Sequence, residues 1–405
     1  MSDEEKIPYF RVNKLLWRWT RYEGADGCTV VREGQLSMDK APPPLPKQQE
    51  LKMTSIRLAP ELPRPDPLIK FVDDIEKISD AFSRFKSWLN TPRSPKEHQP
   101  VPDAGRKQEQ IVPPFDIQEI PGAMRKELMP VSAKLMERWF AGELNYGPTD
   151  KDVAAEMNQK GMPYPADMYD TTTIKLDWVL KHRRAKDQYD ELIKTQIHTS
   201  RAREALKEIL LPYAGRPCLD ATTECGENLS TLLHRHFQFQ YVKVGSSLSQ
   251  KLGELLYADF HNNGVPDDLT GALGSFDIYA AVGYADFRRE GTTRVAEISA
   301  IYVYIKDSYD FTDKHGEVSQ YLGHWSRNGV IVLAYNGAMS YLNKPQLYFS
   351  YPVALGNPKV KGNVYYPIHN KDFREWAIKH QRGGDFVIYS DRRLVRIDPP
   401  IKVYL

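Results

Sequence analysis

The sequence predicts an α+β protein in which a helical middle region is followed by a C-terminal antiparallel curved sheet or half β-barrel. Between residues 115 and 260, apolar residues recur at steps of three and four, the period of amphipathic helices. Beyond residue 270 the period changes to two, as in a half-buried strand, with Phe276, Ile278, Ala280 and Val282 as the alternating positions. Turn sequences then follow at Asn328-Gly329, Asn336-Gly337 and Gly383-Gly384.

Changes in composition divide the chain into four parts. Prolines dominate from residue 36 to 67, and such sequence forms extended, semi-rigid linkers rather than a core. We therefore expect a small N-terminal element at 1–35, Pro-rich linkers around one amphipathic helix at 36–114, a helical domain at 115–265, and a β-rich candidate catalytic domain at 266–405.

The helix expected at 68–89 has one continuous apolar seam between two polar linkers. The seam is formed by Leu68, Phe71, Ile75, Ile78, Phe82, Phe85 and Leu89. Such a seam must be buried against another surface. It either docks on the body of this protein or binds a partner through Phe71, Ile78, Phe82 and Phe85.

The later elements are placed by the same patterns. Pro121 and Pro130 begin helices, because proline suits the first helical turn. A helix at 248–260 ends at Asn263-Gly264, a typical stop signal. After the first strand we expect strands near 294–306, 318–325, 330–336, 346–352, 385–391 and 393–404, with a short helix at 371–380.

Composition excludes several classes of protein. The chain has 55 Lys+Arg against 53 Asp+Glu, so no overall charge favours binding to nucleic acid. The acidic first residues are not followed by an apolar signal-peptide region, and no run of about 18 apolar residues occurs. Three cysteines without a Cys-x-x-Cys pair favour neither a disulfide framework nor a zinc ribbon. We expect a protein that is cytoplasmic where it is made.

The segment Asp307-Ser308-Tyr309-Asp310-Phe311 is the strongest chemical signal, and His315 follows it closely. It continues an apolar run at 301–305 that is typical of a buried strand. Two carboxylates, a phenol and an imidazole are an acid/base or metal-binding set suited to phosphoester chemistry. The alternative is a polar hairpin end, in which Asp and Ser cap turns over packed aromatic rings.

Several segments between residues 115 and 392 resemble a large family of uncharacterised proteobacterial proteins. The segments are 115–125, 134–140, 176–180, 307–311, 321–325 and 382–386. Members of that family resemble cargo of interbacterial toxin systems, chiefly type VI secretion. The resemblance implies secretion without a signal peptide, action in the periplasm of a target cell, a delivery spike or adaptor/chaperone, and a cognate immunity protein.

The β-rich portion, about 270–340, is also similar to the activity domain of colicin M and related bacteriocins. Those domains carry an Asp-x-Tyr-Asp element followed by a His-Arg pair. Asp307, Tyr309 and Asp310 match it, His315 follows with one residue fewer in the spacer, and Gly316 stands where arginine is expected. The resemblance implies metal-dependent cleavage of lipid II between its polyprenyl chain and the pyrophosphate.

Hydrolysis of a pyrophosphate needs charge neutralisation and an oriented water, and this chemistry gives each candidate residue a role. Asp307 and Asp310 would hold Mg²⁺, and Asp310 or His315 would deprotonate the attacking water. Tyr309 would orient a phosphate oxygen or pack the loop. Arg288 or Arg327 would bind phosphate charge. The two resemblances together imply a toxin that hydrolyses lipid II or a related polyprenyl pyrophosphate at a membrane surface. The alternative is a non-enzymatic cargo-binding adaptor of a secretion system that acts through the 68–89 helix.

Overall fold

The computed structural model confirms an α+β fold with a curled antiparallel sheet in its C-terminal region. It describes residues 9–13, 18–22, 36–46, 115–226, 229–245, 266–313, 319–331, 352–356 and 360–405. The predicted helices at 68–89 and 248–260, and the strand predicted at 346–352 apart from its last residue, lie outside these residues. Among the described helices, none is long and apolar enough to cross a membrane.

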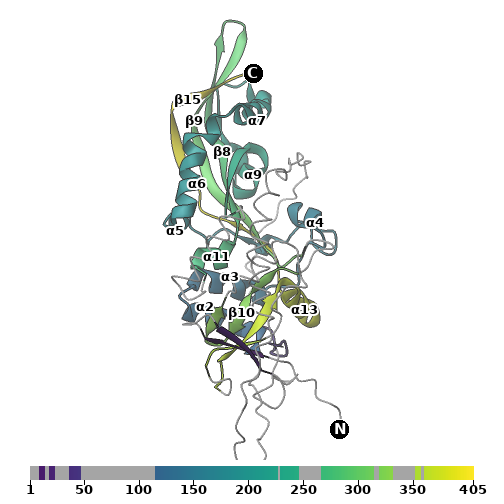
Figure 1. Ribbon diagram of the computed structural model, residues 1–405. Helices are drawn as coiled ribbons and strands as arrows, with labels where there is room; N and C mark the ends of the chain where they lie inside the picture. The colour runs from purple at the N-terminus through teal and green to yellow at the C-terminus, as the bar shows by residue number, and fades with distance from the viewer. Residues whose placement is uncertain are drawn as a thin grey trace, which may run out of the picture.

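The larger sheet has seven strands and is built on one long hairpin, β8 and β9, which runs up the molecule in Figure 1. The strands are β5 (Tyr169–Asp170), β14 (Phe386–Tyr389), β9 (Thr293–Tyr309), β8 (Phe276–Glu290), β6 (Cys218–Asp220), β15 (Arg393–Tyr404) and β7 (Gln238–Val244). The β8–β9 register shifts near Tyr284, and the β15–β9 register shifts between Arg396 and Ile401. Such bulges bend strands, which fits the curl of the sheet.

A second sheet has six strands. Its order is β11 (Gly329–Ile331), β10 (Tyr321–Ser326), β13 (Val364–His369), β12 (Val353–Ala354), β1 (Tyr9–Asn13) and β2 (Arg18–Tyr22). The N-terminal strand β1 pairs in parallel with β12, so the first described residues join the C-terminal region. A two-stranded pair, β3 (Leu36–Ser37) with β4 (Phe115–Asp116), brings the two ends of the predicted linker region side by side.

Helices pack around the two sheets. They are α2 (Ile120–Lys126), α3 (Pro130–Ala141), α4 (Asp150–Ala154), α5 (Leu176–Val179), α6 (Arg183–Lys194), α7 (Ser200–Leu210), α8 (Ala221–Cys225), α9 (Leu229–Phe237), α11 (Asp268–Leu273) and α13 (Asn370–His380). Pro130 is the first residue of α3 and Pro121 lies in the first turn of α2, as the sequence predicts. In Figure 1, α5, α6, α7 and α9 surround the hairpin, while α2, α3 and α13 lie lower, near β10.

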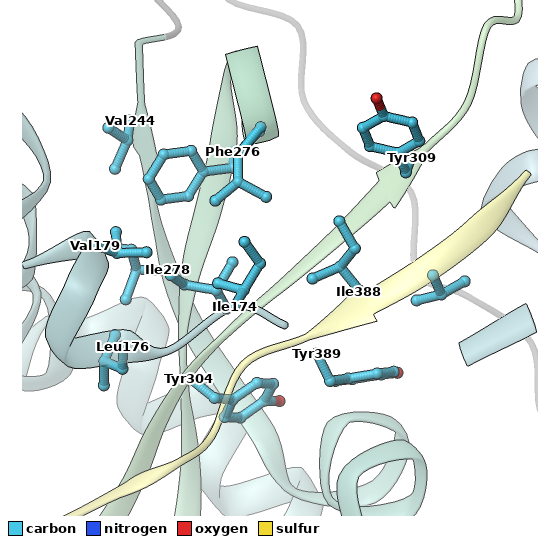
Figure 2. Packing of buried hydrophobic residues seen from close by; sticks show 14 of the residues in the cluster. Ile174, Leu176, Val179, Val244, Phe276, Ile278, Tyr304, Tyr309, Ile388 and Tyr389 are labelled. Atoms are coloured by element: carbon cyan, nitrogen blue, oxygen red, sulfur yellow. The ribbon is translucent and has the colours of Figure 1, made fainter. Parts of the chain in front are cut away.

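The helical and β-rich parts share one hydrophobic core. A continuous cluster of buried side chains includes residues of α3, α5, α9 and the strands β8, β9 and β14. Figure 2 shows part of it, with Leu176, Val179, Ile278, Tyr304 and Ile388 labelled. The boundary expected at residue 265 therefore does not separate two cores, because β5, β6 and β7 from the helical region pair with strands of the β-rich region.

Candidate functional site

Two carboxylates lie close together where strand β9 ends and strand β14 begins. Tyr309 of β9 is the register partner of Phe386 of β14. Asp310 directly follows β9 and Asp385 directly precedes β14. Since the two strands are antiparallel, these two residues lie at the same end of the strand pair. Asp385 is completely buried and Asp310 is half-buried.

Asp385 is held by two side chains and by the backbone. Trp139 of α3 donates from Nε1 to Oδ1 at 2.8 Å, and Arg374 of α13 donates from Nη2 to Oδ2 at 2.7 Å. The amide of Asp385 donates to the carbonyl of Asn145 at 2.7 Å, and Asn145 Nδ2 donates back to the Asp385 carbonyl at 2.6 Å. Three separate segments therefore fix the position of this carboxylate.

The two glycines before Asp385 allow the chain to approach these segments. Gly383 has φ +92°, and a Cβ there would lie 2.8 Å from the ring of Trp139. A Cβ on Gly384 would lie 2.8 Å from the carbonyl oxygen of Glu143. Larger residues would be strained or would clash at these two places. The Gly-Gly pair thus serves close packing beneath Asp385.

Asp310 is positioned by a turn after β9. Its Oδ1 accepts a hydrogen bond from the amide of Thr312 at 3.0 Å, the turn-capping arrangement that the sequence offers as an alternative. Phe311, between them, stacks on Phe373 of α13 with ring centroids 3.9 Å apart. That stacking brings the turn to the helix that carries Arg374, whose Nη2 lies 3.5 Å from Thr312 Oγ1.

Burial makes both carboxylates hard to ionise. Burial raises the pKa of Asp385 to about 7, while the charge of Arg374 lowers it and that of Asp310 raises it. Burial also raises the pKa of Asp310, and the amide of Thr312 and the charge of Arg374 oppose that shift. A carboxyl whose pKa is raised to about 7 is suited to general acid or base catalysis at neutral pH.

Two buried polar atoms near Asp385, Arg374 Nη1 and Asn145 Oδ1, have no hydrogen-bond partner in the described part of the chain. The Tyr164 oxygen accepts from the Gly147 amide, which leaves its O–H donor. The charges of Asp385 and Asp310 act on Tyr164, whose pKa is raised first by burial and then by these carboxylates. Buried polar atoms usually have partners, so two donors and one acceptor are left here for ligand or water oxygens. We call Asp310, Asp385, Arg374, Tyr164 and Asn145 the Asp385 cluster.

The other predicted residues of the 307–315 segment are placed differently. Asp307 lies inside β9, and strand alternation puts it on the same sheet face as Tyr309. Burial raises the pKa of Asp307, and the charges of Asp310 and Asp277 add to the rise. Tyr309 is buried with its ring stacked on Phe386, centroids 5.0 Å apart, so it packs the strand end. His315 lies outside the described residues.

Neither predicted phosphate-binding arginine is near Asp310. Arg288 pairs with Glu297 near the far end of the β8–β9 hairpin, where its register partner is Val295. That position is about 50 Å along β9 from Asp310 at the usual rise of a strand. Arg327 follows β10 and forms an ion pair with Glu119 at 2.6 Å.

Arg374 is the arginine that the structure brings to the two carboxylates. The sequence predicts its helix at 371–380, but the helix pattern emphasises Phe373 and Trp376 rather than this arginine. The proposed partner-binding residues Phe71, Ile78, Phe82 and Phe85 lie outside the described residues.

A comparison with protein-family models gives one match over residues 115–405, more than half of the chain. The model is that of DUF6402, a family of unknown function. The chain belongs to the DUF6402 family. All residues of the Asp385 cluster lie inside the DUF6402 match, which begins at Phe115, the first residue of β4. A comparison with curated proteins found no significant match, and a comparison with solved structures found none.

Both oxygens of Asp385 accept hydrogen bonds, so Asp310 is the carboxylate of the Asp385 cluster that is left for a divalent cation, directly or through water. Among the described residues there is no group of three or more His, Cys, Asp or Glu side chains that could hold a metal ion. Mg²⁺ is commonly bound by one or two carboxylates, with water and substrate phosphates completing its shell. Asp310 together with substrate phosphates fits that type of site.

Proposed function

We propose that this DUF6402 protein is an antibacterial toxin that hydrolyses lipid II or a related polyprenyl pyrophosphate, with the Asp385 cluster as its active site. One observation carries the proposal. A buried carboxyl with a pKa raised to about 7 lies beside a second carboxylate and a guanidinium whose Nη1 is buried and unpartnered. An acid/base pair with a free donor for an anion suits phosphoester hydrolysis.

The reaction divides between the members of the cluster. Arg374 Nη1 and the Tyr164 hydroxyl donate hydrogen bonds to phosphate oxygens and stabilise the negative charge that develops on them. Asp310 takes a proton from the attacking water as the water oxygen bonds to phosphorus. Asp385, in its protonated form, gives a proton to the leaving oxygen as the P–O bond breaks. Mg²⁺, held by the substrate pyrophosphate and through water by Asp310, would supply further charge neutralisation.

The toxin assignment rests on the two sequence resemblances. The segments that resemble toxin cargo include 307–311 and 382–386, which carry Asp310 and Asp385. A toxin of this kind would be delivered by a secretion spike, with an adaptor or chaperone, into the target periplasm. The producing cell would need an immunity protein that blocks the cluster or removes the toxin.

Hydrolysis of purified lipid II tests the proposal. The wild-type protein with Mg²⁺ should release the pyrophosphorylated disaccharide-peptide, identified by its mass. Arg374→Gln should lose at least about 100-fold in rate, because the phosphate loses its charged partner. Arg288→Gln, which changes an arginine at the far end of the hairpin, is the control and should keep the rate. Failure of the wild-type protein to release product with Mg²⁺, Mn²⁺ or Ca²⁺ would exclude this reaction.

A further inference from the structure

An aromatic ring contacts one face of the Arg374 guanidinium. Cζ of Arg374 lies 4.5 Å from the centroid of the Tyr146 ring, which is a cation–π distance. Tyr146 is half-buried, and the side chain of Arg374 is 17% exposed. Tyr146 is therefore in direct contact with the arginine of the Asp385 cluster.

Two kinds of contact hold the guanidinium. In its plane, Nη2 donates to Asp385 Oδ2 at 2.7 Å and lies 3.5 Å from Thr312 Oγ1. These contacts at one nitrogen leave the group able to tilt about the Nη2–Oδ2 direction, and the Tyr146 ring against its face opposes that tilt. The donors of a guanidinium lie rigidly in one plane. Holding that plane therefore also fixes the direction in which the unpartnered Nη1 donates.

The backbone that carries Tyr146 is fixed by its neighbours. The amide of Tyr146 donates to Oε1 of Gln159 at 3.1 Å, and Nε2 of Gln159 donates to the carbonyl of Leu144 at 2.9 Å. The preceding residue, Asn145, exchanges two hydrogen bonds with the backbone of Asp385. The ring is thus attached to the same backbone contacts that position the buried carboxylate.

We propose that Tyr146 is a positioning residue that aligns Arg374 with the reacting phosphate. The inference rests on the proposed function, in which Nη1 of Arg374 donates to a phosphate oxygen. Without the ring, Arg374 keeps its charge and its hydrogen bond to Asp385, but Nη1 loses its fixed direction. A phosphate then keeps the charge attraction and loses part of the directional hydrogen bonding. The part of Tyr146 that acts is the ring.

Binding of methylenediphosphonate, a pyrophosphate analogue that is not hydrolysed, tests the inference by calorimetry in the presence of Mg²⁺. Tyr146→Leu removes the ring and should weaken binding at least about fivefold, a loss of the size of one cation–π contact. Tyr146→Phe keeps the ring and should bind as tightly as wild type. Tyr213→Leu is the matched control and should also bind as wild type. It removes another half-buried tyrosine, whose ring centroid lies 5.0 Å from Cζ of Arg216.

Arg374→Lys shows whether Tyr146 acts through the guanidinium. An ammonium is a point charge with rotatable donors, so its contact with a phosphate does not need a fixed plane. When Arg374→Lys is already present, Tyr146→Leu should therefore weaken binding by less than about twofold. A general effect of the lost ring on the fold would instead weaken binding equally with arginine and with lysine at this position.

Unfolding midpoints check that the variants are folded, and Tyr146→Gln repeats the test with a side chain suited to a half-exposed position. The inference is overturned if wild type does not bind the diphosphonate, or if both ring-deleting variants bind it as tightly as wild type. A loss in Tyr146→Phe or Tyr213→Leu as large as in Tyr146→Leu, or an equal loss with lysine at 374, also overturns it.

Hydrolysis of lipid II by the wild-type protein remains a separate readout. Hydrolysis together with unchanged diphosphonate affinity in Tyr146→Leu would retain the proposed function and reject the role of Tyr146. Diphosphonate binding that depends on Tyr146, without hydrolysis of lipid II, would reject the proposed reaction and retain the positioning of Arg374.

Discussion

Arg374 and Asp385 form an ion pair of 2.7 Å in which the carboxylate is completely buried, while Nη1 of the arginine keeps no hydrogen-bond partner in the described part of the chain. A buried ion pair stabilises a fold only when the remaining donors and acceptors are also satisfied. Here one donor is left over, together with the Tyr164 hydroxyl and Asn145 Oδ1. These unpaired atoms support the proposed ligand site, and the protonation of Asp385 should be measurable.

Asp385→Asn should change how stability depends on pH. In the folded protein the pKa of Asp385 is raised to about 7, against about 3.9 in the unfolded chain. Between these values the folded state binds more protons, so the free energy of unfolding falls as pH rises from about 4 to about 7. The total is on the order of 4 kcal/mol, at about 1.4 kcal/mol per pKa unit.

Urea unfolding at a series of pH values from about 4 to 8 measures this contribution. It is the difference in the free energy of unfolding between wild type and Asp385→Asn. The difference should vary with pH throughout the window. Asp286→Asn, which changes an exposed carboxylate of β8, is the matched control. A constant difference for Asp385→Asn would show that Asp385 does not titrate near neutrality.

Gly383→Ala should destabilise the protein by about 1–3 kcal/mol, since it combines a positive φ with a contact of 2.8 Å to the Trp139 ring. Gly161→Ala separates the two causes. Gly161 also has a positive φ, +67°, but nothing lies within 4 Å of its added Cβ. Thermal unfolding should therefore show a larger loss for Gly383→Ala than for Gly161→Ala. Equal losses would mean that the contact with Trp139 does not matter.

Phe311→Ala should cost about 3–5 kcal/mol, because it removes a buried ring stacked on Phe373 and in edge contact with Trp139. It should also lower hydrolytic activity in protein that remains folded, since the turn carrying Asp310 loses its anchor to α13. Leu394→Ala, at a side chain 52% exposed, is the control and should change stability by less than about 0.5 kcal/mol. Chemical denaturation of wild type, Phe311→Ala and Leu394→Ala measures the loss of stability. A loss in Phe311→Ala no larger than in Leu394→Ala would contradict the stabilising role of the Phe311 ring.

The sequence predicts individual helices and strands better than it predicts which of them are in contact. The period-two pattern at Phe276–Val282 correctly indicates β8, and the helix expected at 371–380 is found as α13 at Asn370–His380. The strand β13 is not expected, because Pro367 interrupts a short apolar run. Strand β7 (Gln238–Val244) lies inside the region interpreted as helical, and its buried residues Phe239, Val242 and Val244 do not alternate strictly.

The candidate site could be predicted only at Asp310, which the 307–311 segment singles out. Asp385 and Trp139 are separated by 246 residues, so no local pattern indicates their hydrogen bond. Gly383-Gly384 indicates a tight turn, but its purpose, close approach to Trp139 and Glu143, depends on the tertiary packing. Arg374 is one of several arginines in the sequence, and only the docking of α13 on the turn after β9 selects it.

The activity of Asp310→Asn tests the central claim most directly. Asparagine keeps the Oδ1 acceptor for the Thr312 amide, so the turn should remain intact while the carboxylate is lost. With wild-type unfolding behaviour confirmed, the variant should hydrolyse lipid II at least about 100-fold more slowly and should no longer inhibit growth when directed to the periplasm of susceptible cells. A folded Asp310→Asn protein with the wild-type rate and toxicity would contradict the account and leave the Asp385 cluster as a structural ion pair.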